Sequence, residues 1–232
     1  MLIFDIYLVL KKLITPKMNK FTFKLFITGM ICLFALSANA QTRLYENPQF
    51  DMIAKDHKTL AILPFEASVK LRPKQMKEIT AEQLSKMAQS EGLAIQNSMY
   101  TWFLTRKKRG KLSLEIQDPK RTRALLQENN ITNPGKHTPE ELGQILGVDA
   151  VISGTFETDK PMSDGASIAL GLLVGFWGST NSAMVNMSVN NSVDGELLWN
   201  YNKRVAGSLG SSTDVLINTL MRKASRRLAY TK

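Results

Sequence analysis

Five stretches of residues 58–232 carry apolar side chains in the patterns that strands show. Two are almost continuously apolar, which is typical of buried strands, and three alternate apolar with polar positions, as half-buried strands do. In chain order they are Thr59–Phe65, Leu112–Ile116, Ala150–Phe156, Ala183–Val189 and Leu197–Tyr201. Asp194-Gly195 lies between the last two and predicts a tight hairpin turn.

Four further stretches have helical spacing or a helix-start signal. The longest spans about Lys74–Arg106, and Gly92 within it is a candidate break or bend. Asp118-Pro119 predicts a second helix, because aspartate caps helix starts and proline suits the first turn. A capping box, Thr138-Pro139-Glu140-Glu141, predicts a third. The fourth is predicted over Thr213–Tyr230, where apolar residues form one stripe.

The order of these elements predicts an α/β fold. Helices alternate with strands, and a hairpin followed by a helix closes the chain, so we expect a mixed sheet of about five strands flanked by helices. Residues 58–232 are predicted as a single domain, which is long enough to bury a hydrophobic core. Residues 41–57 are polar without a sustained period, and we expect them to form a loose lead-in.

A secretory signal peptide is predicted before this domain, over residues 18–40. Lys20 and Lys24 form its basic start and Leu25–Leu36 its apolar core. Ser37-Ala38-Asn39-Ala40 has the small-residue pattern of a cleavage site, so the exported chain would begin at Gln41. The protein is therefore expected in the periplasm or at the periphery of the outer membrane.

The residues around this signal refine the predicted location of the protein. A lipoprotein signal places cysteine directly after the cut, whereas this chain has Gln41 there, so we expect no lipid anchor. Residues 1–17 precede a complete signal with its own Met18, which favours translation from Met18. The alternative is an uncleaved anchor that starts at Met1; Leu25–Leu36 is short for a span of about 20 residues.

Charge adds one candidate contact. The whole chain has a formal net charge of +10, but residues 41–232 hold 25 Lys and Arg against 19 Asp and Glu, or +6. The densest basic run is a possible anionic contact, and its residues are Arg106, Lys107, Lys108, Arg109 and Lys111. The alternative is a solvated helix end, where cations suit the helix dipole. Nucleic acid is not an expected partner of an exported chain.

Catalytic, metal-binding and cofactor-binding motifs were not found, so we expect no enzyme activity and no cofactor. The only cysteine, Cys32, lies inside the predicted signal, and the histidines His57 and His137 belong to no metal-ligand pattern. Gly171–Gly175 lacks the lysine of a phosphate-binding loop. Distant side chains can still converge in a fold, so a hydrolase remains an alternative.

Ala166–Gly178 is almost entirely apolar or small and has three interpretations. It is a buried core segment, an exposed patch that docks on a partner or a second copy, or a peripheral membrane contact. The possible partner or membrane contacts within it are Leu172, Leu173, Phe176 and Trp177.

Three motifs together resemble a bacterial envelope family. They are Lys58–Phe65, Glu141–Gly154 and Asp194–Trp199. The family includes the curli-secretion channel protein, the lipoprotein activators of penicillin-binding proteins and the amino-terminal domain of the Tol-system propeller protein. This resemblance implies an anticodon-binding-domain-like fold and a non-catalytic role. It also implies partners among envelope proteins, or a homo-oligomer within an envelope secretion apparatus.

Overall fold

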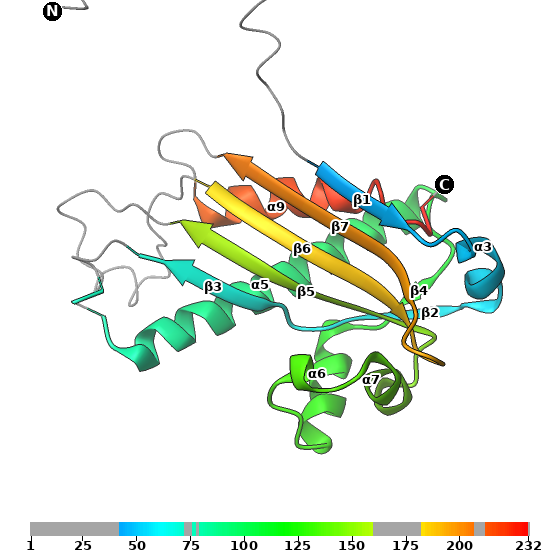
Figure 1. Ribbon diagram of the computed structural model, residues 1–232, viewed down its shortest axis with the longest axis horizontal. Coiled ribbons are helices and arrows are strands. Elements are labelled where there is room, and N and C mark those ends of the chain that lie inside the picture. The colour runs from blue at the N-terminus through cyan, green and yellow to red at the C-terminus, as the bar shows by residue number, and fades with distance from the viewer. Residues whose placement is uncertain (1–41, 72–75, 78, 160–181, 207–211, 232) are drawn as a thin grey trace, which may run out of the picture. The chain divides into compact units, whose positions relative to one another are not determined.

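The computed structural model describes residues 42–71, 76–77, 79–159, 182–206 and 212–231, all within one unit, Gln41–Lys232. Seven strands among them form one sheet with helices packed on it (Figure 1). The elements are β1 (Thr42–Glu46), α3 (Phe50–Ile53), the 3-10 turn η1 (Ala54–Asp56), β2 (Thr59–Ile62), β3 (Glu66–Lys70), α5 (Ala81–Lys108), β4 (Glu115–Ile116), α6 (Pro119–Glu128), the 3-10 turn η2 (Pro134–Lys136), α7 (Pro139–Leu146), β5 (Ala150–Asp159), β6 (Ser182–Asn191), β7 (Leu197–Ala206) and α9 (Thr213–Ala224).

The sheet is mixed, as the sequence predicts, but it has more strands than the five expected. The strand order is β1-β7-β6-β5-β2-β4, and β3 pairs with the far half of β5. β2 and β3 run parallel to β5, and β4 runs parallel to β2. β5, β6, β7 and β1 are antiparallel neighbours. The α/β class and the closing hairpin followed by a helix are confirmed.

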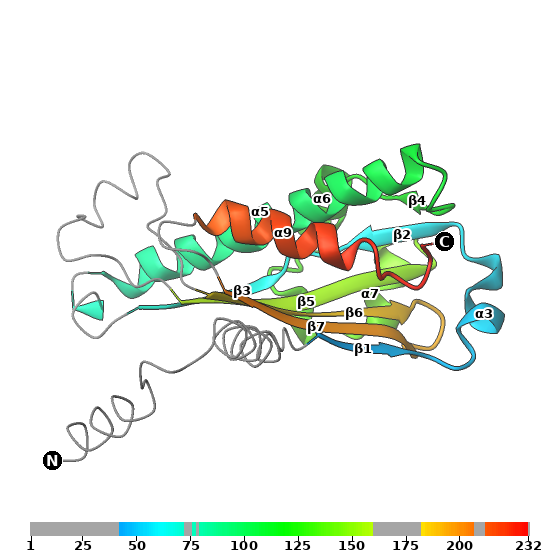
Figure 2. The ribbon, with the colours of Figure 1, turned by 90° about the horizontal axis from the view of Figure 1, so that it is seen from above.

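Two helices cover one face of the sheet. Figure 2 shows α5 and α9 on the same side of the strands. Alternate residues of β2 point to opposite sides: Leu60 and Ile62 join the core under α5, whereas Ala61 joins a smaller cluster with residues of α6 and α7. The second cluster lies at one end of the sheet, where α6 and α7 pack (Figure 1).

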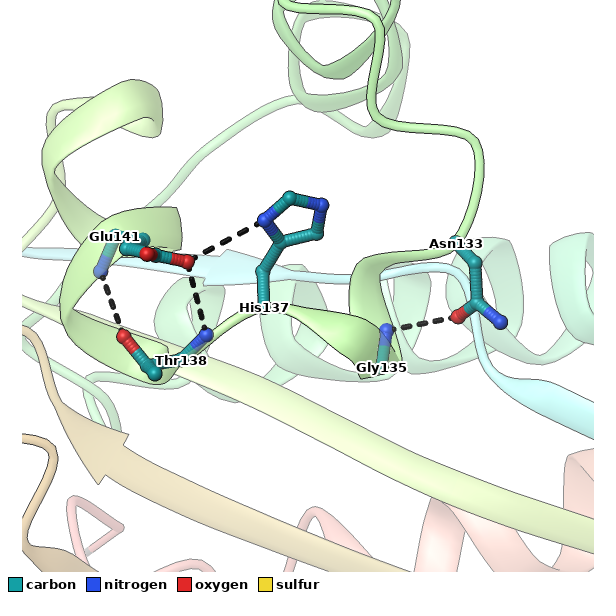
Figure 3. A network of polar contacts seen from close by, with 5 residues as sticks. All are labelled: Asn133, Gly135, His137, Thr138 and Glu141. Atoms are coloured by element: carbon teal, nitrogen blue, oxygen red, sulfur yellow. Dashed lines mark hydrogen bonds and ion pairs between the residues drawn. The ribbon is translucent and has the colours of Figure 1, made fainter.

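The helix-start signals in the sequence are confirmed atom by atom. Asp118 accepts a hydrogen bond from the N–H of Lys120 at 2.7 Å and begins α6. Thr138 and Glu141 form the predicted capping box of α7, with both bonds at 3.3 Å (Figure 3). The Glu141 carboxylate also lies 3.3 Å from Nδ1 of His137, so this histidine belongs to the cap. These contacts satisfy N–H groups that a helix start leaves unpaired.

The lead-in predicted over residues 41–57 is wrong. Thr42–Glu46 forms β1, and Phe50–Ile53 forms a short helix with Phe50 in the core. β3, Glu66–Lys70, was also missed. Both strands lie at an edge of the sheet and are mostly exposed. Pairing with distant strands holds them in place, so their own side chains lack the apolar alternation that predicts a strand.

Helix boundaries differ from the prediction at two ends. α5 begins at Ala81, after a Thr80–Gln83 capping box, and runs unbroken through Gly92. A Cβ at Gly92 would lie 2.1 Å from the carbonyl oxygen of Phe65, so this glycine allows close packing on the strands. α9 ends at Ala224, because the Ser225 hydroxyl donates to the carbonyl of Arg222 at 3.0 Å and the chain turns.

The hairpin is confirmed, although its turn is longer than predicted. Five residues, Ser192–Glu196, connect β6 and β7, and Gly195 adopts the positive φ of 71° expected for glycine in such a turn. The predicted signal peptide and the Ala166–Gly178 segment lie outside the described residues. Both interpretations stay predictions.

Candidate functional site

A broad polar surface lies on the side of the sheet opposite α5 and α9. Residues of β1, β5, β6 and β7 that alternate with the core positions point to this side. We call it the open face, and it comprises Arg43, Tyr45, Thr155, Glu157, Asn186, Ser188, Asn200, Asn202 and Arg204. Among the described elements, only α7 packs on this side of β6, at the end near Ser192. All nine side chains are exposed or half-buried.

Amide side chains form a cross-strand network in the middle of the open face. The Nδ2 of Asn200 lies 3.0 Å from the Asn186 Oδ1, 3.0 Å from the Ser188 hydroxyl and 3.1 Å from the Met187 carbonyl. Asn202 stands opposite Asn186 in the strand register. Asparagine is depleted in strands, so sheet stability does not account for three of them on adjacent strands. An asparagine amide carries two donors and one acceptor; the Asn200 donors and the Asn186 acceptor are used within the network.

Aromatic and charged groups flank this network. Tyr45 is 44% exposed and stands opposite Asn200 on the edge strand β1. On the other flank, Lys70 of β3 forms an ion pair of 2.7 Å with Glu157. The open face therefore combines hydrogen-bonding groups in its centre with an aromatic ring at one edge, which suits non-covalent recognition.

A cluster of polar and aromatic side chains around His57 lies at the end of the sheet where the chain enters β2. Nδ1 of His57 lies 2.6 Å from the hydroxyl of Tyr230, and the Tyr230 ring packs edge-on against Phe50 at 4.8 Å. The Asp149 carboxylate accepts bonds from the N–H groups of Lys58 and Thr59, each at 2.8 Å. Through these hydrogen bonds, Asp149, which precedes β5, and Tyr230, near the carboxyl terminus, are both joined to the start of β2.

The pKa shifts in this cluster have clear causes. Burial lowers the pKa of His57, and the nearby Asp149 only partly offsets that effect. Burial raises the pKa of Tyr230 well above its usual value, and Asp149 adds to the rise. Burial alone would raise the pKa of Asp149, but the donors from Lys58 and Thr59 outweigh it, and the pKa is lowered. These shifts favour a neutral His57 beside an ionised Asp149.

The hydroxyl within hydrogen-bond reach of His57 belongs to Tyr230. A nucleophile must be activated by its base, and the raised pKa of Tyr230 disfavours the deprotonated, nucleophilic form of that hydroxyl. Within the described ranges, the side-chain bonds of His57 go to Tyr230 and Asn191, and His137 bonds to Glu141. No group of three or more His, Cys, Asp or Glu able to hold a metal ion occurs among the described residues.

The residues of the predicted basic run have different environments in the structure. Arg106 is only 5% exposed and points at α9, where its Nε donates to the Ser225 hydroxyl at 3.3 Å. Lys107 forms an ion pair with Glu115 of β4. The other three members, Lys108, Arg109 and Lys111, remain exposed at the carboxyl end of α5. The sequence did not predict the burial of Arg106, because this burial comes from α9, more than one hundred residues further along.

Leu172, Leu173, Phe176 and Trp177 lie outside the described residues, so their predicted contact with a partner or membrane stays a prediction. In the part of the chain that the structure describes, no helix is long and apolar enough to cross a membrane.

The open face was missed from the sequence, although part of its signal was present. The polar positions of 183–189 and 197–201 were recognised only as partners of the apolar ones. Their content of asparagine, which strands disfavour, was the available clue. No described helix covers these positions, because α5 and α9 pack on the other side of the sheet and α7 packs at one end. The periodicity of a strand does not reveal where the helices pack.

Comparisons with known proteins found no matching family model and no matching curated protein. Solved structures do match. A PelC dodecamer from Paraburkholderia phytofirmans has 11% identity and a TM-score of 0.41, with 83% of this chain and 99% of that chain covered. The lipoprotein GNA1162 from Neisseria meningitidis has 15% identity and a TM-score of 0.37, with 74% and 99% covered. The LpoB C-terminal domain from Salmonella enterica has 10% identity and a TM-score of 0.32, with 69% and 94% covered.

These matches agree with the resemblance found in the sequence, in that LpoB is among them. At TM-scores below 0.5, the matches do not show what this chain binds.

Proposed function

We propose that this chain is an exported, non-catalytic binding protein of the bacterial cell envelope, and that its open face binds a partner protein. The observation that carries the proposal is the polar open face around the Asn186–Ser188–Asn200 network, whose side chains are exposed or half-buried. Such groups recognise a partner without forming or breaking covalent bonds. The envelope location comes from the signal peptide predicted over residues 18–40.

The size of the open face favours a protein partner. The four strands of the open face, β5, β6, β7 and β1, span about 19 Å at ~4.8 Å per strand. About eight residues along each long strand add roughly 26 Å, which gives an area of about 500 Å². A stable protein interface buries about 800 Å² on each partner, so the open face and its rim fit that class.

Site-specific photocrosslinking tests this assignment. A photoreactive residue at Asn202 or Thr155, both on the open face, is expected to capture one envelope protein in living cells. The matched control carries the same residue at Gln127, which is exposed on α6. Asn186→Lys and Asn202→Lys should abolish capture from Thr155, because a long charged side chain disrupts the contact. Equal capture from Gln127, or capture unaffected by both lysines, would contradict the proposal.

The absence of a lipid anchor is also part of the proposal, because Gln41 stands where a lipoprotein has cysteine. Intact-mass measurement of the exported protein is expected to give the mass of residues 41–232 without acylation. A mass that retains Met18, or an added lipid, would contradict this.

A second candidate is a self-assembling envelope component, and β1 favours it. Leu44 is 48% exposed, and β1 pairs only with β7 among the described strands, so its outer edge is available to another strand. Light scattering of the exported protein should then give a mass of several chains, reduced to one chain by Leu44→Lys. A single-chain mass for the unchanged protein removes this candidate.

A further inference from the structure

Arg106 is a buried cation that forms no ion pair with another described residue. It lies in the last turn of α5 and is 5% exposed. Its Nε donates to the hydroxyl of Ser225 at 3.3 Å, but its Nη2 is buried with no hydrogen-bond partner. An unpaired buried charge is costly, and proteins normally pair it or leave it in water. The fold therefore holds a guanidinium group in place without using its full donor capacity.

Two more arginines lie beside this group. Arg109 is the cap residue after α5, three positions beyond Arg106, and Arg226 follows Ser225, the cap residue after α9; both are exposed. Burial lowers the pKa of Arg106, and repulsion from Arg226 and Arg109 lowers it further. Glu115 pairs with Lys107, the neighbour of Arg106 in the chain. Arg226 and Arg109 thus both repel the Arg106 guanidinium.

We propose that Arg106, Arg109 and Arg226 bind a phosphate group at the junction of α5 and α9. Guanidinium forks match phosphate oxygens in pairs, and three forks from two helices suit a tetrahedral oxyanion with acceptors on every side. A bound phosphate neutralises the repulsion on Arg106, and a shift of the Arg106 guanidinium toward it gives Nη2 the acceptor that it lacks. This site lies on the helix-covered side of the sheet, so it is independent of the open face.

Helix dipoles do not account for the arrangement. Cations favour the last turn of a helix, which explains exposed residues such as Lys108 and Arg109. The dipole gives no reason to bury a guanidinium and leave one nitrogen without a partner, because water would solvate that group at lower cost.

Titration with inorganic phosphate, at ionic strength held constant with chloride, tests the site. We expect phosphate to raise the thermal unfolding midpoint of the exported protein more than chloride does. Arg226→Gln and Arg109→Gln should each weaken phosphate affinity about tenfold, since each removes a charge-assisted contact. The matched control, Arg121→Gln on α6, should bind phosphate as the unchanged protein does. No preference for phosphate over chloride, or equal losses in Arg226→Gln and Arg121→Gln, would overturn the proposal.

A variant at Arg106 separates ligand binding from a structural role. Arg106→Met keeps most of the apolar stem and removes an unpaired charge, so its midpoint without phosphate should equal or exceed that of the unchanged protein. Its phosphate response should be lost. A lower midpoint with an intact phosphate response would mean that Arg106 is a structural residue, and the site would be withdrawn.

Vesicles distinguish the two sources of phosphate. If the ligand is a lipid headgroup, the protein sediments with phosphatidylglycerol vesicles, Arg226→Gln does not, and free phosphate releases the bound protein. If titration detects inorganic phosphate but vesicles capture nothing, the site takes soluble phosphate compounds, which also supports the proposal. Binding to neither contradicts it.

Discussion

Gln96 and Arg106 are both buried on α5, but they differ in how fully their polar groups are hydrogen-bonded. Gln96 donates to the Ile62 carbonyl at 2.6 Å and accepts from Arg123 at 2.7 Å, so both ends of its amide are satisfied. It joins α5 to β2 and α6. Arg106 donates from its Nε, but its Nη2 is buried without a hydrogen-bond partner. A buried polar group that is fully bonded stabilises a fold, whereas a partly bonded one costs free energy and requires another explanation.

His57 makes stability depend on pH. Its pKa in the folded protein lies below the ordinary 6.5, so the unfolded chain binds more protons in the interval between the two values. The free energy of unfolding should therefore fall as the pH drops below about 6.5 and recover above it. His57→Gln should weaken this dependence, measured as urea midpoints between about pH 5 and pH 8.

The second histidine provides the control. His137→Gln removes a side chain in the α7 cap, and that variant should keep the fall below about pH 6.5. If His57→Gln keeps the whole fall instead, the titrating group is not His57.

At the scale of elements, local signals predicted the starts of α6 and α7 and the hairpin. Asp118, Thr138 and Gly195 act within a few residues of themselves, so their effect is visible in the sequence. β1 and β3 could not be predicted this way, because β7 and β5 define them from more than 80 residues away. The burial of Arg106 under α9 and the open face are likewise products of how elements pack.

The packing of α5 on the strands depends on Gly92. Alanine favours helices by about 1 kcal/mol over glycine, so helix propensity alone predicts that Gly92→Ala stabilises the protein. The new Cβ would lie 2.1 Å from the Phe65 carbonyl oxygen, which is backbone and cannot rotate away. We expect a net loss of about 1–3 kcal/mol in the free energy of unfolding, measured by urea denaturation. Asn97→Ala, at an exposed position of the same helix, should be neutral or stabilising; a stabilising Gly92→Ala would contradict the close contact.

The whole molecule has two sides with different chemistry. The helix side ends in a cluster of arginines at the junction of α5 and α9, and the open face presents amides and hydroxyls. β1 belongs to both, since Tyr45 stands opposite Asn200 on the open face while Thr42 accepts a hydrogen bond from the buried Lys203 on the other side.

Removal of β1 should therefore affect the entire domain. A chain that begins at Pro48 loses five cross-strand pairs and leaves Lys203 without its hydroxyl partner. We expect about 2 kcal/mol or more of lost stability, and association through the uncovered edge of β7, compared with a chain that begins at Gln41. Urea denaturation and size-exclusion chromatography measure the two effects. An unchanged midpoint and a single-chain elution volume would show that β1 is dispensable.

The pairing of β1 with β7 also determines when the protein can finish folding. Thr42 meets Lys203, so the first strand waits for a partner 161 residues later in synthesis. Closing such a long loop is slow, and β1 remains unpaired until nearly the whole chain is made. In the export that we propose, the chain crosses the membrane unfolded. The dependence of β1 on β7 would then delay completion of the fold until translocation is almost over.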